Sequence, residues 1–141
     1  MKDIERKITY KDTEYTVVFN LNVMEALQDK FGSMDAWVDL VDGTANARKA
    51  YKEAHGSMKG WDSLEDGNPE KEGEPDIKAL IYGYYVMLNE GIEIDNENGK
   101  NIQPVTEKQV GRILTAVGFA KAQKQLGELM TDSTQSNEKN E

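Results

Sequence analysis

Residues 79–88 read ALIYGYYVML, ten consecutive residues without a charge in a chain of 141 residues whose formal net charge is -9. From position 77 onward the apolar residues recur at helical spacing, and further apolar and aromatic residues widen the stripe until it runs almost all round. The stretch is far shorter than the roughly 20 residues that cross a bilayer. It therefore predicts a buried core helix, capped by Asp76 and ending at Gly91, and not a membrane segment.

The N-terminal segment 4–19 has the pattern of a β-hairpin. Two β-rich runs, at 8–10 and 15–19, flank the polar residues 11–14. In the second run large apolar residues alternate with smaller or more polar ones, so one face of the hairpin is expected to be strongly apolar.

Two short helices are expected directly after the hairpin. Asn22 followed by Glu25 has the spacing of a capping box, and Gly32 is a suitable C-terminal stop. Ser33 then predicts the start of a second helix that ends near Gly43. Both segments carry apolar residues on one face, which we expect to contact the core.

The C-terminal third predicts two more helices. The turn signal at 98–99 lies between apolar residues, so 92–105 is expected to form a small hairpin or a structured loop. Thr106 and Gln109 have capping-box spacing and open the next helix. After Gly118 a further apolar face continues to residue 130.

Three segments have weak patterns. Residues 44–55 predict a weakly anchored helix or none, and the proline-containing, strongly acidic residues 61–76 predict a flexible loop. The polar residues 131–141 predict a disordered tail. The fold expected from the whole pattern is α+β: one predominantly helical domain over residues 1–130, with an N-terminal β-hairpin and a disordered C-terminal tail.

Composition excludes several classes of function. Acidic residues outnumber basic ones by 26 to 17, and no dense basic run supplies the cationic surface of a nucleic-acid-binding domain. There is no cysteine, so neither disulfides nor thiolate chemistry is available. The opening residues MKDIERK lack the apolar stretch of a signal peptide, and none is expected.

The sequence offers no pattern typical of catalysis. His55 is the only histidine and has no motif-borne nucleophile beside it, so we expect no catalytic role for it. Residues 95–99 superficially resemble a calcium loop, but glycine falls at the fifth position instead of the sixth and Thr106 stands where glutamate is required. No catalytic residue, metal site or cofactor is therefore expected.

The apolar residues divide into an expected core and candidate partner contacts. Tryptophan and methionine side chains can form adaptable binding surfaces, and for Trp61, Met58 and Met130 both core and surface remain open. The candidate partner-binding residues are Trp61, Met58, Leu126, Leu129 and Met130. The expected core contains Phe19, Leu27, Phe31, Trp37, Leu80, Ile81, Tyr84, Leu88, Val110, Ile113 and Leu114.

Three stretches together carry a family resemblance: YTVVFNLNVMEALQDKFGSMDAWVDLVDG (15–43), DIKALIYGYYVMLNEG (76–91) and TEKQVGRIL (106–114). Their order resembles that of the tail assembly chaperones of long-tailed bacteriophages, the group shared with prophages and gene-transfer agents. The three stretches cover 54 of the 141 residues, and residues 44–75 look like an insertion relative to the pattern.

The resemblance implies a non-enzymatic factor that is made in the host bacterial cytoplasm and is absent from the mature virion. Members of the family bind the long tape measure protein while the tail tube polymerises around it. The implied partners are therefore the tape measure protein and, secondarily, the tail tube protein. Self-association as a homo-oligomer through the apolar helices is an open alternative, and neither nucleic acid nor a membrane is expected as a partner.

Two other functions stay open at this stage. One is a structural tail completion or connector protein of the virion, which would remain in the finished particle. A small acidic regulator that mimics nucleic acid would depend on residues 61–76 and would bind a basic partner in a salt-sensitive way.

Overall fold

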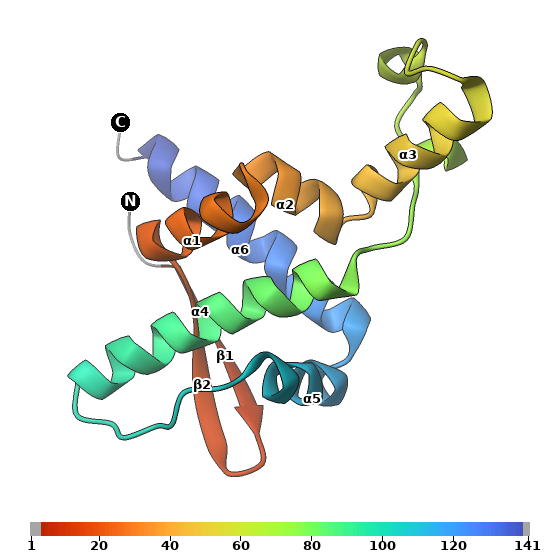
Figure 1. The fold of residues 1–141 in the computed structure, drawn as a ribbon. Helices are drawn as coiled ribbons and strands as arrows, with labels where there is room; N and C mark the ends of the chain where they lie inside the picture. The colour runs from red at the N-terminus through yellow and green to blue at the C-terminus, as the bar shows by residue number, and fades with distance from the viewer. Residues whose placement is uncertain (1–3, 140–141) are drawn as a thin grey trace.

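The computed structural model describes residues 4–139 and confirms the predicted α+β class. A two-stranded antiparallel sheet, β1 (Ile4–Tyr10) and β2 (Thr13–Phe19), precedes the helices (Figure 1). Two 3-10 turns, Trp61–Ser63 and Pro69–Lys71, separate the third helix from the fourth. Within the described range the helices are α1 (Leu21–Phe31), α2 (Met34–Val41), α3 (Thr44–His55), α4 (Ile77–Glu97), α5 (Glu107–Val117) and α6 (Phe119–Lys139).

The predicted hairpin is confirmed, with a tighter turn than the sequence suggested. Ile8 pairs with Tyr15, and only two residues connect the strands, with Lys11 in the left-handed region at φ 54°. The expectation of one apolar face is only partly right, since β2 is buried on both faces near its end. There the Thr16 hydroxyl accepts from the Lys7 ammonium at 2.7 Å and donates to Asp95 at 2.9 Å, which satisfies a polar group under α4.

The start of α1 differs from the prediction in its capping residue. The N-cap is Asn20, whose side chain accepts a hydrogen bond from the Val23 amide at 3.2 Å. Asn22 lies inside the first turn, and its side chain instead donates to Glu90. Gly32 ends α1 with φ 90°, as predicted, and Ser33 caps α2, as predicted.

Helix α4 runs through the middle of the molecule and contacts β2, α1, α2 and α5 (Figure 1). The prediction that it ends at Gly91 is wrong, because the helix continues to Glu97. Gly91 is a contact position: a Cβ there would overlap the carbonyl oxygen of Thr16. Gly83 has a similar role, since a Cβ would run into the indole ring of Trp37. The two glycines thus let β2 and α2 approach the α4 backbone closely.

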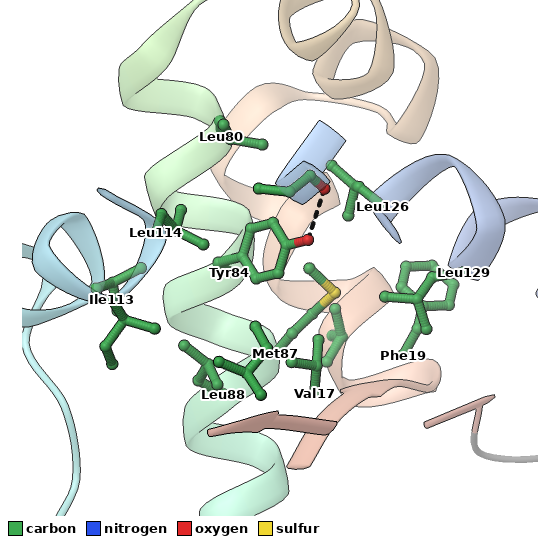
Figure 2. Close-up of a cluster of buried hydrophobic side chains, with 14 of the residues drawn as sticks. Val17, Phe19, Leu80, Tyr84, Met87, Leu88, Ile113, Leu114, Leu126 and Leu129 are labelled. Atoms are coloured by element: carbon green, nitrogen blue, oxygen red, sulfur yellow. Dashed lines mark hydrogen bonds between the residues drawn. The ribbon is translucent and has the colours of Figure 1, made fainter. Parts of the chain in front are cut away.

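The core forms around α4. Figure 2 shows Tyr84 reaching from α4 towards α6, where its hydroxyl donates to the carbonyl of Ala122 at 2.7 Å and lies 3.0 Å from the side-chain oxygen of Gln125. Burial raises the pKa of Tyr84 well above its usual value, so the phenol is neutral in the folded chain. Of the residues expected in the core, Phe31 and Ile81 are only partly buried and contact its edge. The buried ones are Phe19, Leu27, Trp37, Leu80, Tyr84, Leu88, Val110, Ile113 and Leu114.

Residues 98–105 form a structured loop, so the hairpin alternative for 92–105 is wrong. Two asparagines of α4 hold this loop, because each side chain bonds both the carbonyl and the amide of one loop residue, as a neighbouring β-strand would. Asn89 donates to the carbonyl of Val105 at 3.0 Å and accepts from its amide at 2.9 Å. Asn96 makes the same pair of bonds with Ile102, at 3.0 and 2.9 Å. The predicted capping box at the start of α5 is present in the structure.

Residues 44–75, which we call the α3 module, form a helix and a folded loop beside the main body (Figure 1). The weak-helix prediction and the flexible-loop prediction for 61–76 both missed a second, small core made by Ala47, Tyr51 and Trp61. The Tyr51 hydroxyl donates to the carbonyl of Lys59 at 2.7 Å, which fixes the loop to the helix. Composition could not reveal these contacts because they join the helix to the loop that follows it, across a turn with no regular periodicity.

The C-terminal prediction also differs from the structure. The backbone of α6 is helical through Lys139, so most of the expected tail 131–141 continues the helix, and residues 140–141 lie outside the described residues. Asp132 forms an ion pair with Arg6 of β1, which ties this part of α6 to the hairpin. Adding residues to an existing helix costs much less than starting one, so polar residues can extend it.

The contact at Gly91 gives a first prediction. Gly91→Ala should lower the free energy of unfolding by about 1–3 kcal/mol, because the added methyl group forces α4 and β2 apart. Urea titration followed by circular dichroism measures the change. The matched control is Gly127→Ala in α6, where a Cβ meets nothing within 4 Å and where alanine should add about 0.5–1 kcal/mol. Equal stability of the two variants would contradict the close contact.

The asparagine bonds give a second prediction. Asn89→Ala should speed hydrogen exchange at the Val105 amide about tenfold, because that amide loses its acceptor. Exchange followed by NMR measures the rate. Asn98→Ala is the control, since the Asn98 side chain bonds only within α4, to the carbonyl of Ile94. If both variants left the Val105 rate unchanged, the loop would be held by other contacts.

Candidate docking groove

An apolar groove of about 240 Å³ lies between α2 and α6. Trp37 and Val41 form part of its wall from α2, and Leu126 forms part of it from α6; all three are buried. The remaining lining residues are more accessible, and two of them, Asp42 and Gln123, are polar. The full lining is Trp37, Val38, Val41, Asp42, Gln123, Leu126, Gly127 and Met130.

Hydrogen bonds fix the walls of the groove. The Trp37 indole N–H donates to the carbonyl of Ala79 at 3.1 Å, which holds the ring between α2 and α4. The Gln123 amide donates to the carbonyl of Val41 at 3.1 Å and ties α6 to the end of α2. Gly127 is exposed, and a Cβ there would meet no atom within 4 Å. The groove is therefore open above Gly127 and held in shape on both sides.

The candidate partner-binding residues do not form one surface. Leu126 is 3% exposed and Leu129 is fully buried, so both belong mainly to the core and the assignment of Leu129 to a partner surface is wrong. Leu126 and the half-buried Met130 line the groove. Trp61, 7% exposed, and the partly buried Met58 lie in the small core of the α3 module. An apolar helical stripe does not tell a core contact from a docking contact, which explains the error.

Six of the eight lining residues were not predicted as partner contacts: Trp37, Val38, Val41, Asp42, Gln123 and Gly127. Val38 shares a helix face with Trp37 and Val41, so it was grouped with the apolar face of its helix. The sequence did contain a signal for Gly127. A glycine inside an otherwise regular helix lowers the stability of the helix, so its presence there indicates a role in packing or binding. Here the glycine leaves open space beside the groove.

Charged groups in the described residues are mostly at the surface. His55 forms an exposed contact with Glu70 at 2.6 Å and rests against the Tyr51 ring. Within the described part of the chain, no group of three His, Cys, Asp or Glu side chains is placed to hold a metal ion, and no buried side-chain polar atom lacks a partner. Over residues 4–139, no helix is both long enough and apolar enough to cross a membrane.

No protein-family model, curated protein or solved structure matches the chain.

The separation of the two cores gives a third prediction. Among the described residues, no member of the main core comes from the α3 module, and the ends of the module meet where the Asp76 amide donates to the carbonyl of Leu40 at 2.8 Å. Replacing residues 44–74 with a short Gly-Ser linker should leave a cooperatively folded body that is destabilised by less than about 2 kcal/mol. Near-ultraviolet circular dichroism and urea unfolding measure this.

Trp37→Ala is the matched control, because it removes a fully buried side chain of the main core and should cost about 3–5 kcal/mol. A deletion variant that unfolds as readily as this control would show that the body depends on the α3 module.

Proposed function

We propose that this protein is a tail assembly chaperone of a long-tailed phage or prophage. It acts in the host cytoplasm without catalysing a reaction, binds a helical segment of the tape measure protein, and is left out of the mature virion. The observation that carries the proposal is the open apolar groove between α2 and α6. The resemblance of residues 15–43, 76–91 and 106–114 to this family supplies the identity of the client.

The groove has the chemistry that a transient helix-binding site needs. Amphipathic helices bind by placing an apolar face into a groove, with anchors at helical spacing. The lining is mostly apolar, and the unbranched Met130 side chain can adapt to anchors of different shape. Such contacts are broad and exchangeable, so a client can be released to the tube subunits.

The position of Gly127 supports the approach of a second helix. A glycine on the exposed side of α6 lets another backbone come closer than any other residue would. Asp42 and Gln123 provide polar groups at the same groove and can fix the direction of the client. The net charge of -9 keeps the chaperone in solution while it holds an apolar client.

The fourth prediction tests the proposal by co-expression with a tape measure protein, which the proposal expects to be encoded beside this gene. The wild-type chain should raise the soluble fraction of that protein and co-purify with it. Gly127→Leu should lower the co-purified amount about tenfold, because the leucine side chain fills the groove. Gly127→Ala is the matched control and should retain binding, since its methyl group enters open space.

Thermal unfolding must show that Gly127→Leu is folded, which the open space at this position leads us to expect. The proposal would be overturned if the wild-type chain neither raised the soluble fraction of the tape measure protein nor formed a complex with it. Mass spectrometry of purified particles separates it from a structural tail completion or connector protein, because detection of the chain in stoichiometric amounts would favour the virion component.

A further inference from the structure

A second concavity, of about 470 Å³, lies on another side of α4, between α1 and the loop 98–105. We call it the α1–α4 cleft. It shares no lining residue with the docking groove. Its walls combine apolar residues with aromatic, amide and carboxylate side chains, and the ones used below are Asn22, Tyr82, Tyr85, Asn89, Glu90 and Glu93.

The carboxylates of the cleft carry charge that no basic residue neutralises. Glu90 and Glu93 stand one helical turn apart on α4, and neither has a Lys, Arg or His partner within 4 Å in the described part of the chain. Glu90 is half-buried, and one of its oxygens accepts from the side chains of Asn20 at 2.7 Å and Asn22 at 2.9 Å. Its other oxygen receives no hydrogen bond from the described residues and can accept one from a ligand.

One ring of the aromatic wall already contacts a cation, Lys30, which is not itself among the residues that line the cleft. The Lys30 ammonium lies 5.2 Å from the centroid of the Tyr82 ring, and the Tyr82 and Tyr85 rings are 5.9 Å apart. Burial, helped by the nearby Tyr85, Glu107 and Asp29, raises the pKa of Tyr82. The rings and the surrounding charges therefore favour a positive group over a negative one.

The cleft is held in shape before any ligand arrives. Asn89 and Asn96 fix the loop that forms one wall through paired bonds to Val105 and Ile102. Asn20 and Asn22 orient the Glu90 carboxylate from the side of α1. A ligand would not have to order these groups on binding, which reduces the entropic cost of the complex.

We propose that the α1–α4 cleft binds an arginine side chain of a partner protein, with the guanidinium group against Tyr85 and paired with Glu90 and Glu93. A guanidinium is planar, stacks on aromatic rings and donates several hydrogen bonds to carboxylates in a fixed geometry. A metal ion fits less well, because the described residues place no three ligating side chains together there. A second copy of the chain fits less well because each copy has a net charge of -9.

The inference goes beyond the proposed function and does not depend on it. It assigns a surface that would select partners with exposed arginine, whereas the docking groove selects an apolar helix face. The two surfaces can be tested separately, since Gly127 lines only the groove and Glu90 lines only the cleft.

The fifth prediction uses NMR titration of the full chain, labelled with ¹⁵N, with a synthetic alanine-based helical peptide that carries arginine at four-residue spacing. The amides of residues 82–96 and of 22–26 should shift most. A peptide of the same sequence with citrulline, which is neutral but has the same shape, should bind at least about tenfold more weakly. Raising the salt concentration should weaken binding of the arginine peptide and leave binding of the citrulline peptide unchanged.

Charge-removing variants locate the binding. The double variant Glu90→Gln, Glu93→Gln should lower the affinity for the arginine peptide about tenfold. The amide introduced at position 90 keeps an oxygen that can accept the hydrogen bonds from Asn20 and Asn22. Glu97→Gln removes a charge from an exposed position on the same helix outside the cleft and should change affinity less than about twofold.

Three outcomes would overturn the inference. Equal affinity for the citrulline and arginine peptides would show that the cleft does not recognise the positive charge. Shifts spread over the whole acidic surface, with Glu97→Gln as damaging as the double variant, would show non-specific attraction. Sedimentation that detects dimers of the wild-type chain but not of the double variant would show that a second copy occupies the cleft.

Discussion

The close approach of other elements to the backbone of α4 is the constraint on which the rest of the structure depends. At Gly91 the carbonyl of Thr16 occupies the space that a side chain would need, and at Gly83 the Trp37 ring does the same. These contacts bring the hairpin and α2 onto one helix. Tyr84 lies between the two glycines and links α4 to α6 by its hydroxyl. A helix that is apolar nearly all round must be covered by other elements on most sides, and the two glycines allow those elements to approach its backbone closely.

Local patterns in the sequence predicted most of the elements. The hairpin, the Ser33 and Thr106 caps and the buried helix from residue 77 all depend on residues close together in the chain, and the structure contains each of them. Gly91 was misread because a glycine that stops a helix and one that admits a neighbouring strand look the same in sequence. The contact that distinguishes them joins residues 16 and 91 and has no local signal.

The candidate site was less predictable than the fold. Leu126 and Met130 were singled out and do line the groove, but Leu129 and Trp61 are buried elsewhere. A helical stripe reports that a face is apolar and does not report what covers it. The two concavities differ in a way that composition conceals: one is mostly apolar, and the other combines tyrosine rings with unpaired carboxylates. The sequence analysis assigned no role to the acidic residues of α4, and two of them, Glu90 and Glu93, line the cleft.

The α3 module leaves the body at Gly43 and returns beside it, where the backbone of Gly73 lies so close to Gly43 that neither position has room for a side chain. Its two ends are therefore fixed together at the base. The entropic cost of closing such a segment rises only with the logarithm of its length, by about 0.6 kcal/mol for each doubling. Natural variation could lengthen or shorten this appendage widely without disturbing the main core, so chains with the same body and very different overall sizes are to be expected.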